Sequence, residues 1–279
     1  MKVVFFVITI FISLLVAGLW FWRLSDHSSD RVRKKRLMAA QRADPARFDP
    51  SMVSGLPEPA RRYLKFAIRP GTPLYTVAEI SMAGKFGLGT GTASDYMNMT
   101  AEQILALPTG FIWKMQAQKG LMHMSGSDSE SWTRFWLLGL IPVARLGGSP
   151  DHARSAFGRY AAEAVFWTPA ALLPGSGVRW ASVDENTARV VIHHNGIVQP
   201  VDVTVAADGS PTKVSFLRWS DANPDKVHRL QPFGGYLSEY RNFGGFRLPT
   251  HVEAGNFFGT EDYFPFFIVD VMAIDFPRP

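Results

Sequence analysis

The sequence predicts an α+β domain preceded by one transmembrane helix. Residues 3–22 form an unbroken apolar run. Further along the chain, apolar residues alternate with period two in many short segments, which is typical of strands, and only two longer segments have helical spacing. We therefore expect a large, curved, mostly antiparallel β-sheet, half-barrel-like in shape, with a few helices on one face.

The apolar run has the length of a membrane span. A helix rises about 1.5 Å per residue, so residues 3–22 would reach about 30 Å, the hydrocarbon thickness of a bilayer. Trp20 and Trp22 beside Arg23 are typical of an interfacial belt. A cleaved signal peptide, the alternative, would need a shorter apolar core and small residues at its cleavage site. We expect a retained transmembrane anchor over residues 1–24.

Residues 25–55 are expected to form a basic juxtamembrane segment and linker. Six Lys or Arg lie within fourteen residues after Trp22, against Lys2 and the amino group before the run. This count favours a cytoplasmic domain on a single-pass membrane protein, while a solvated spacer on either side is the alternative. We assign seven residues to the membrane interface: Trp20, Trp22, Arg23, Arg33, Lys34, Lys35 and Arg36.

The net charge of +5 belongs to the N-terminal part of the chain. The chain has 29 Lys and Arg and 24 Asp and Glu, of which residues 1–45 hold eight and three, so the remaining 21 and 21 cancel. A neutral domain argues against a nucleic-acid partner. The absence of cysteine excludes disulfides, thiolate catalysis and cysteine-ligated metal sites.

Residues 56–279 are long enough for a single α+β domain. Prolines in the first turn and apolar residues at helical spacing predict a helix over 57–68, and Ser149 followed by Pro150 predicts a helix to about 165. Period-two patterns predict strands at 78–82, 111–118, 178–183, 188–194, 201–206, 212–219, 235–242, 247–255 and 262–272. Strands so close in sequence are expected to pair antiparallel.

The most suggestive polar group lies on the second helix. Arg159 and Glu163 are four residues apart on one stripe. If this stripe faces the hollow of the sheet, Arg159 can hold an acidic headgroup, Glu163 can act as base or counter-ion, and Trp167 can wall the pocket. The alternative is a solvated ion pair. We also assign Trp113 and Asp128 to this ligand site.

Other chemistry has little support. No phosphate loop, nucleophile elbow or zinc-protease motif occurs, and Ser127 is expected in a polar turn. His251 and Glu253 share a strand face, but a metal site would need a third ligand such as His123 or Asp128 from elsewhere. We expect no metal and no cofactor.

Several blocks together resemble a bacterial family of uncharacterised proteins that often carry an N-terminal anchor. The blocks span 56–64, 110–113, 158–163, 169–174, 232–235 and 258–263, and the likeness covers roughly residues 56–270. The resemblance implies no reaction, although it favours Arg159, Glu163 and Trp167 as site residues.

The preferred hypothesis is a membrane-tethered, non-catalytic module that binds a hydrophobic or lipid-like ligand in the hollow of the sheet. The anchor, the neutral strand-rich domain and a surplus of aromatic residues in 257–267 motivate it. One alternative is an enzyme with Glu163, Asp128 or His251 as base. A second is a scaffold that binds a protein partner through a sheet edge or an apolar patch.

Overall fold

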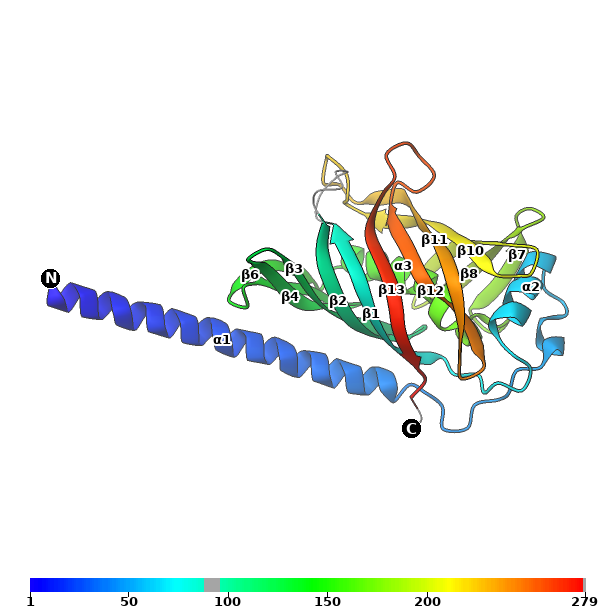
Figure 1. Ribbon diagram of the computed structural model, residues 1–279, viewed down its shortest axis with the longest axis horizontal. Helices are drawn as coiled ribbons and strands as arrows, with labels where there is room; N and C mark the ends of the chain where they lie inside the picture. Colours follow the sequence, from blue (N-terminus) through cyan, green and yellow to red (C-terminus); the bar gives the residue numbers. More distant parts are fainter. Residues whose placement is uncertain (88–95, 278–279) are drawn as a thin grey trace.

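The computed structural model describes residues 1–87 and 96–277. Three α-helices and thirteen strands are formed in this part of the chain (Figure 1). The helices are α1 (Lys2–Met38), α2 (Glu58–Ala67) and α3 (Pro150–Trp167). The strands are β1 (Val77–Gly87), β2 (Tyr96–Ala106), β3 (Gly110–Lys119), β4 (Met122–Ser129), β5 (Trp132–Leu137), β6 (Ile141–Gly147), β7 (Val178–Ser182), β8 (Thr187–His194), β9 (Ile197–Val205), β10 (Pro211–Ser220), β11 (Arg229–Phe243), β12 (Phe246–Asn256) and β13 (Phe264–Asp275).

All thirteen strands belong to one antiparallel sheet in the order β6-β5-β4-β3-β2-β1-β13-β12-β11-β10-β9-β8-β7. The first six strands run outward to one edge, and the last seven return from the other edge. The last strand, β13, therefore pairs with β1 in the middle, with Ile80 opposite Ile274. Helix α3 connects the two edges, which forces it to cross a face of the sheet.

Helix α3 packs in the hollow of the curved sheet. The Ser149 hydroxyl caps its first turn by accepting from the His152 N–H, as the sequence predicts. Gly158 permits a close approach, since a Cβ there would lie 2.9 Å from the Gln199 amide oxygen and 3.2 Å from the Phe216 ring. The expected α+β fold, with helices against a large antiparallel sheet, is confirmed.

The expected elements form where the period-two and helical patterns are clear. Both predicted domain helices and every predicted strand overlap an observed one. The polar turn expected around Ser127 is wrong, because residues 122–129 form β4, paired on both sides by β3 and β5. Small and polar residues are accommodated in β4 because charged side chains lie on both of its faces, Arg159 beside Asp128 and Asp30 beside Ser127.

Helix α1 has two halves with different surroundings. It is 37 residues long, and its N-terminal part is apolar and long enough to cross a membrane. This part projects away from the domain (Figure 1). The C-terminal half packs on the convex face of the sheet, the face opposite α3, where Asp26, Asp30 and Leu37 are buried.

Polar contacts attach α1 to the sheet. Asp26 accepts hydrogen bonds from the Trp136 Nε1–H at 2.9 Å and the Arg145 Nη1–H at 2.9 Å. Asp30 accepts from the Ser127 hydroxyl at 2.8 Å. These contacts recur every three or four residues along one side of the helix, which therefore docks through charge as well as apolar contact.

Three basic residues that the sequence assigns to the membrane interface also contact the sheet. Arg23 donates a hydrogen bond to the Ser125 hydroxyl oxygen at 3.1 Å. Arg33 forms an ion pair with Glu130 at 2.7 Å, and Lys34 forms one with Glu79. Lys35 and Arg36 are exposed. The basic segment is thus partly engaged by the domain.

The pKa values of the two aspartates shift in opposite directions. Burial acts to raise the pKa of Asp26, but hydrogen bonds from Arg145 and Trp136 and the charges of Arg145 and Arg134 outweigh it and lower this pKa. Burial raises the pKa of Asp30 despite its bond from Ser127. Asp26 therefore stabilises docking above its unfolded pKa and ceases to do so as the pH falls through its folded pKa, whereas ionised Asp30 opposes docking.

Asp26→Asn and Asp30→Asn form a matched test of this docking. At pH 7, Asp26→Asn should speed hydrogen exchange of the amides in residues 23–38 at least tenfold, because hydrogen bonds to a charged group contribute about 1.5–3 kcal/mol. Asp30→Asn should leave exchange unchanged or slow it, because it removes a buried charge. Equal acceleration by both variants would contradict the assignment.

Candidate functional site

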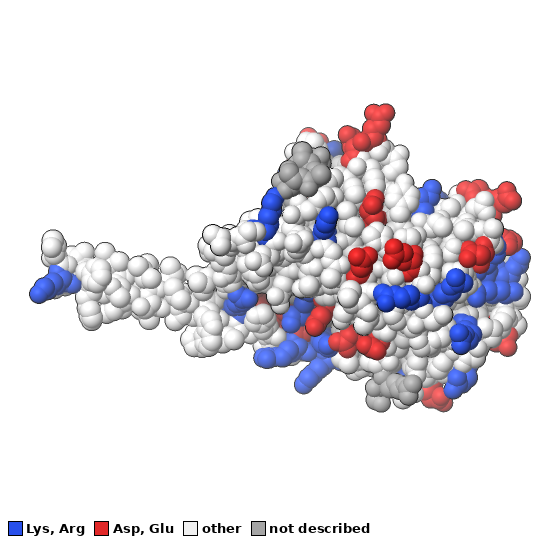
Figure 2. All heavy atoms as spheres, viewed as in Figure 1, with Lys and Arg blue, Asp and Glu red and all other residues white. Residues whose placement is uncertain are grey.

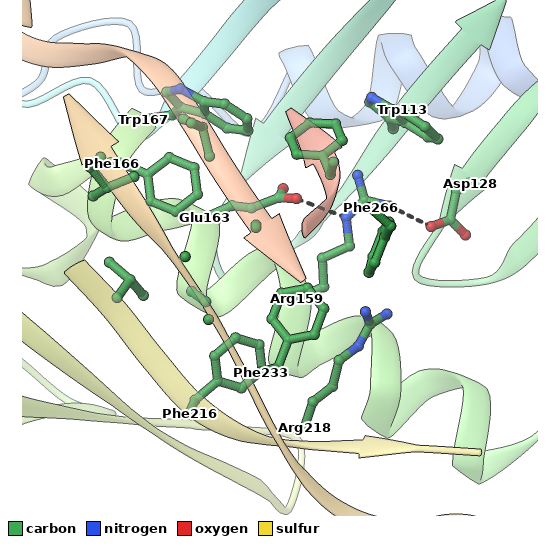
Figure 3. Close-up of a pocket in the computed structure, with 18 of the residues that line it drawn as sticks. Trp113, Asp128, Arg159, Glu163, Phe166, Trp167, Phe216, Arg218, Phe233 and Phe266 are labelled. Atoms are coloured by element: carbon green, nitrogen blue, oxygen red, sulfur yellow. Dashed lines mark hydrogen bonds and ion pairs between the residues drawn. The ribbon is translucent and has the colours of Figure 1, made fainter. Parts of the chain in front are cut away.

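A cavity of about 290 Å³ lies between α3 and the concave face of the sheet. Its wall is mostly aromatic and aliphatic, and a few charged groups converge on it (Figure 3). The lining includes Phe86, Trp113, Phe135, Phe166, Trp167, Val214, Phe216, Phe233, Leu237, Val252, Phe266 and Phe267, together with Asp128, Arg159, Glu163 and Arg218. A mostly apolar wall with a few convergent polar groups is typical of small-molecule pockets.

Arg159 is held between two carboxylates. Its Nε–H donates to Glu163 Oε1 at 2.7 Å, and its Nη1–H donates to Asp128 Oδ2 at 2.6 Å (Figure 3). The side chains of Arg159, Asp128 and Glu163 are 16%, 17% and 11% exposed. Helix α3 supplies two members of this ion cluster and β4 supplies the third, so the cluster links the helix to the sheet.

Neighbouring side chains fix the ion cluster further. The Gln103 amide donates to Glu163 Oε2 at 2.5 Å, and the Thr133 hydroxyl donates to Asp128 Oδ1 at 2.5 Å. The guanidinium carbon of Arg159 lies 5.0 Å from the Trp113 ring centroid. Burial opposes the charge of Arg159, but Glu163 and Asp128 outweigh it and raise the pKa of Arg159.

Arg218 is the second cation of the pocket. Its Nε is buried without a hydrogen-bond partner among residues 1–87 and 96–277, and its guanidinium carbon lies 5.0 Å from the Phe233 ring centroid. Burial, together with the nearby charge of Arg159, lowers the pKa of Arg218 to about 10. Arg218 remains charged at pH 7, and within the described residues it forms no ion pair like the two of Arg159.

The five ligand-site residues named from the sequence all line this cavity. Arg159, Glu163 and Asp128 form the ion cluster. Trp113 and Trp167 form part of the cavity wall. The indole Nε1 atoms of both tryptophans are buried without a hydrogen-bond partner among the described residues. Two buried donors therefore remain unsatisfied around the cavity, where native structures normally satisfy them.

Arg218 and three phenylalanines were missed at the sequence level. Phe216, Phe233 and Phe266 reach the cavity from β10, β11 and β13 (Figure 3). The signal for Arg218 was present, because residues two apart on a strand share a face and Arg218 follows Val214 and Phe216 in that pattern. Nothing local indicated which face of β10 would turn toward α3.

The residues considered for a metal site do not meet. Within residues 1–87 and 96–277, no three His, Asp or Glu side chains are grouped as metal ligands would be. Asp128 faces the hollow, whereas His251 lies on the convex face and contacts Asp270 at 2.7 Å. His251 is therefore separated by the sheet from Asp128 and Glu163.

The fold and cavity define a curved antiparallel sheet with a helix across its hollow and an aromatic pocket between them. The chain belongs to a family of unknown function (DUF6544), whose model matches residues 46–268. The resemblance to an uncharacterised family is thereby confirmed. Comparison with curated proteins gives no match.

Two solved structures resemble this chain at low similarity. One is a LolA superfamily protein from Nitrosomonas europaea, with 11% identity and a TM-score of 0.38, covering 78% of this chain and 91% of that one. The other is a putative outer membrane lipoprotein-sorting protein domain from Vibrio parahaemolyticus, with 11% identity and a TM-score of 0.36, covering 72% and 85%. At these scores, the functional interpretation rests on this chain's own cavity.

The ion cluster should be a large contributor to stability. Arg159→Met leaves Asp128 and Glu163 close together without their cation, and we expect a loss of about 3 kcal/mol in the free energy of unfolding. Arg154→Met is the matched control, because Arg154 is exposed on the same helix and only stacks on Trp219 at 4.1 Å. Its loss should be below about 1 kcal/mol. Denaturant unfolding of the full chain in detergent measures both, and equal losses would refute this role.

Proposed function

We propose that this protein is a membrane-tethered, non-catalytic module that binds an amphiphile with an acidic head and an apolar body. The observation that carries this proposal is the aromatic cavity beside Arg218, whose buried Nε has no hydrogen-bond partner in the described part of the chain. A volume of about 290 Å³ is near the lower end for ligand pockets. It suits one slender apolar chain better than a bulky ring system.

The acidic head is assigned to Arg218. Arg159, the cation expected from the sequence to hold an acidic group, already has two carboxylate partners. Arg218 offers a buried Nε–H that finds no acceptor among the described side chains and backbone, and an incoming carboxylate or phosphate would supply one. Arg159 then acts to hold α3 at the sheet, which keeps the cavity in shape.

Binding is favoured over catalysis by the state of the two carboxylates. Glu163 and Asp128 each accept a hydrogen bond from Arg159, and each accepts a second one from Gln103 or Thr133. A general base must lie within hydrogen-bond reach of the substrate proton, whereas here every carboxylate oxygen already accepts a hydrogen bond from the protein. Their arrangement supports a structural and electrostatic role.

The tether is assigned to the free half of α1. Trp20 and Trp22 are 53% and 47% exposed, and Arg23 follows them, as at a membrane interface. Arg33 lies eleven residues beyond Trp22, about 16 Å further along a continuous helix. We therefore retain Trp20, Trp22 and Arg23 at the interface, whereas Arg33 and Lys34 hold α1 to the sheet. The count of positive charges still favours a cytoplasmic domain.

Photo-crosslinking tests the ligand and its orientation. The full chain in lipid nanodiscs is irradiated with a diazirine-bearing palmitic acid, and the adducts are mapped by mass spectrometry. We expect adducts on peptides that contain Phe216, Phe233 and Phe266. Adducts scattered over α1 and the outer surface, with no enrichment in these peptides, would contradict the proposal.

The charge assignment has its own control. Arg218→Met should lower the adduct yield of the acid about tenfold, because a charge-assisted hydrogen bond contributes about 1.5–3 kcal/mol. The yield with the corresponding diazirine alcohol should change little. The surface variant Arg154→Met should leave both yields unchanged. An equal drop for acid and alcohol would indicate lost packing rather than lost head recognition.

A further inference from the structure

Two neighbouring hairpin ends carry exposed apolar side chains beside α1. On the turn between β3 and β4, Leu121 is 97% and Met122 is 39% exposed. On the turn between β5 and β6, Leu138, Leu140 and Ile141 are 57%, 39% and 51% exposed. We call these five residues the apolar tips. The Leu138 N–H donates to the His123 carbonyl at 2.8 Å, so the two turns adjoin.

The apolar tips lie at the level where α1 leaves its apolar run. Arg23 occupies the space next to Gly139, where a Cβ would meet its Nη1 at 2.0 Å. The Trp22 ring lies 5.7 Å from Trp136, and the guanidinium of Arg145 lies 4.5 Å from both rings. The β5–β6 hairpin is therefore fixed against the residues that mark the end of the proposed membrane span.

The charge around the apolar tips suits an anionic lipid surface. Residues 103–127 and 132–150 contain Lys, Arg and His but no Asp or Glu. Figure 2 shows mostly uncharged atoms on the end of the domain nearest the free part of α1. Acidic side chains would resist approach to anionic headgroups, and their absence from both hairpin ends removes that barrier. Asp128, further along β4, faces the hollow.

The backbone of the β5–β6 turn gives independent support. Leu138 has φ 50° and Gly139 has φ 73°, and the Leu140 N–H donates to the Leu137 carbonyl. This is a tight turn whose first position favours Asn, Asp or Gly. Leu138 therefore holds a left-handed backbone conformation that is unusual for leucine, and its side chain is 57% exposed.

We propose that the apolar tips insert into the same membrane leaflet interface from which α1 emerges. This inference rests on the proposal that α1 crosses the bilayer. The domain then touches the membrane at two places, the helix and the hairpin ends, and its tilt is set. Phe135 of β5 lines the cavity, and Leu138 follows it by three residues, about 10 Å along the chain. The hairpin end proposed to contact lipid and the ligand pocket therefore share strand β5.

Site-specific labelling tests the inference, because the chain has no cysteine and any introduced one is unique. Leu140→Cys is labelled with the fluorophore NBD in the full chain and reconstituted into vesicles of phosphatidylethanolamine and phosphatidylglycerol. Val183→Cys, a 48% exposed position at the far hairpin of β7 and β8, is the matched control. Leu14→Cys reports on the proposed span.

We expect the label at position 140 to emit at shorter wavelength than the label at 183, and to be quenched several-fold more by doxyl-labelled lipids. Adding Leu138→Asn and Ile141→Thr to the labelled chain should reduce this quenching, and circular dichroism should show an unchanged fold, because Asn suits the turn. If position 14 is in lipid while 140 behaves as 183 does, the hairpin inference fails and the tether stands. If 14 and 140 are both in water, both fail.

Discussion

Helix α3 must cross the hollow of the sheet, and this path determines where the pocket and the ion cluster form. Because β13 pairs with β1 in the middle of the sheet, the chain must pass from edge strand β6 to edge strand β7. An 18-residue helix spans about 27 Å and makes this crossing over the concave face. The hollow is thereby partly filled, and the charges of α3 must find partners in the sheet.

Strand β4 binds a helix on each of its faces through alternate residues. Asp128 faces the hollow and binds Arg159 of α3, while Ser127 faces the opposite side and binds Asp30 of α1. A strand whose neighbours on both faces are charged helices has little need of large apolar residues. The same strand therefore connects the pocket with the helix that we assign to the membrane, and the pocket and the tether form one continuous arrangement.

The sequence predicted the elements better than their relations. Period-two patterns located most strands, and capping chemistry located α3, because both are local signals. The polar composition of β4 predicts a turn instead of a strand, because its small and polar residues suit helices α1 and α3, which are distant in sequence. The helical spacing of Arg159 and Glu163 predicts that they lie together. The ion pair of Asp128 with Arg159 depends on how the helix packs on the sheet. The same packing leaves the Arg218 Nε without a hydrogen-bond partner among the described residues. The residues of α1 that contact the sheet, such as Asp26 and Asp30, recur at helical spacing. Their role is visible only in the structure, where Asp26 binds Arg145 and Asp30 binds Ser127.

The proposed ligand of the hollow is an acidic amphiphile whose acidic head group lies at Arg218. Crystals of the full chain grown with a fatty acid brominated near its methyl end would test this directly through the anomalous signal of bromine. We predict a bromine peak among Phe216, Phe233 and Phe266, with continuous density leading to the Arg218 guanidinium. Bromine found only on the outer surface, with the hollow closed by side chains, would contradict it.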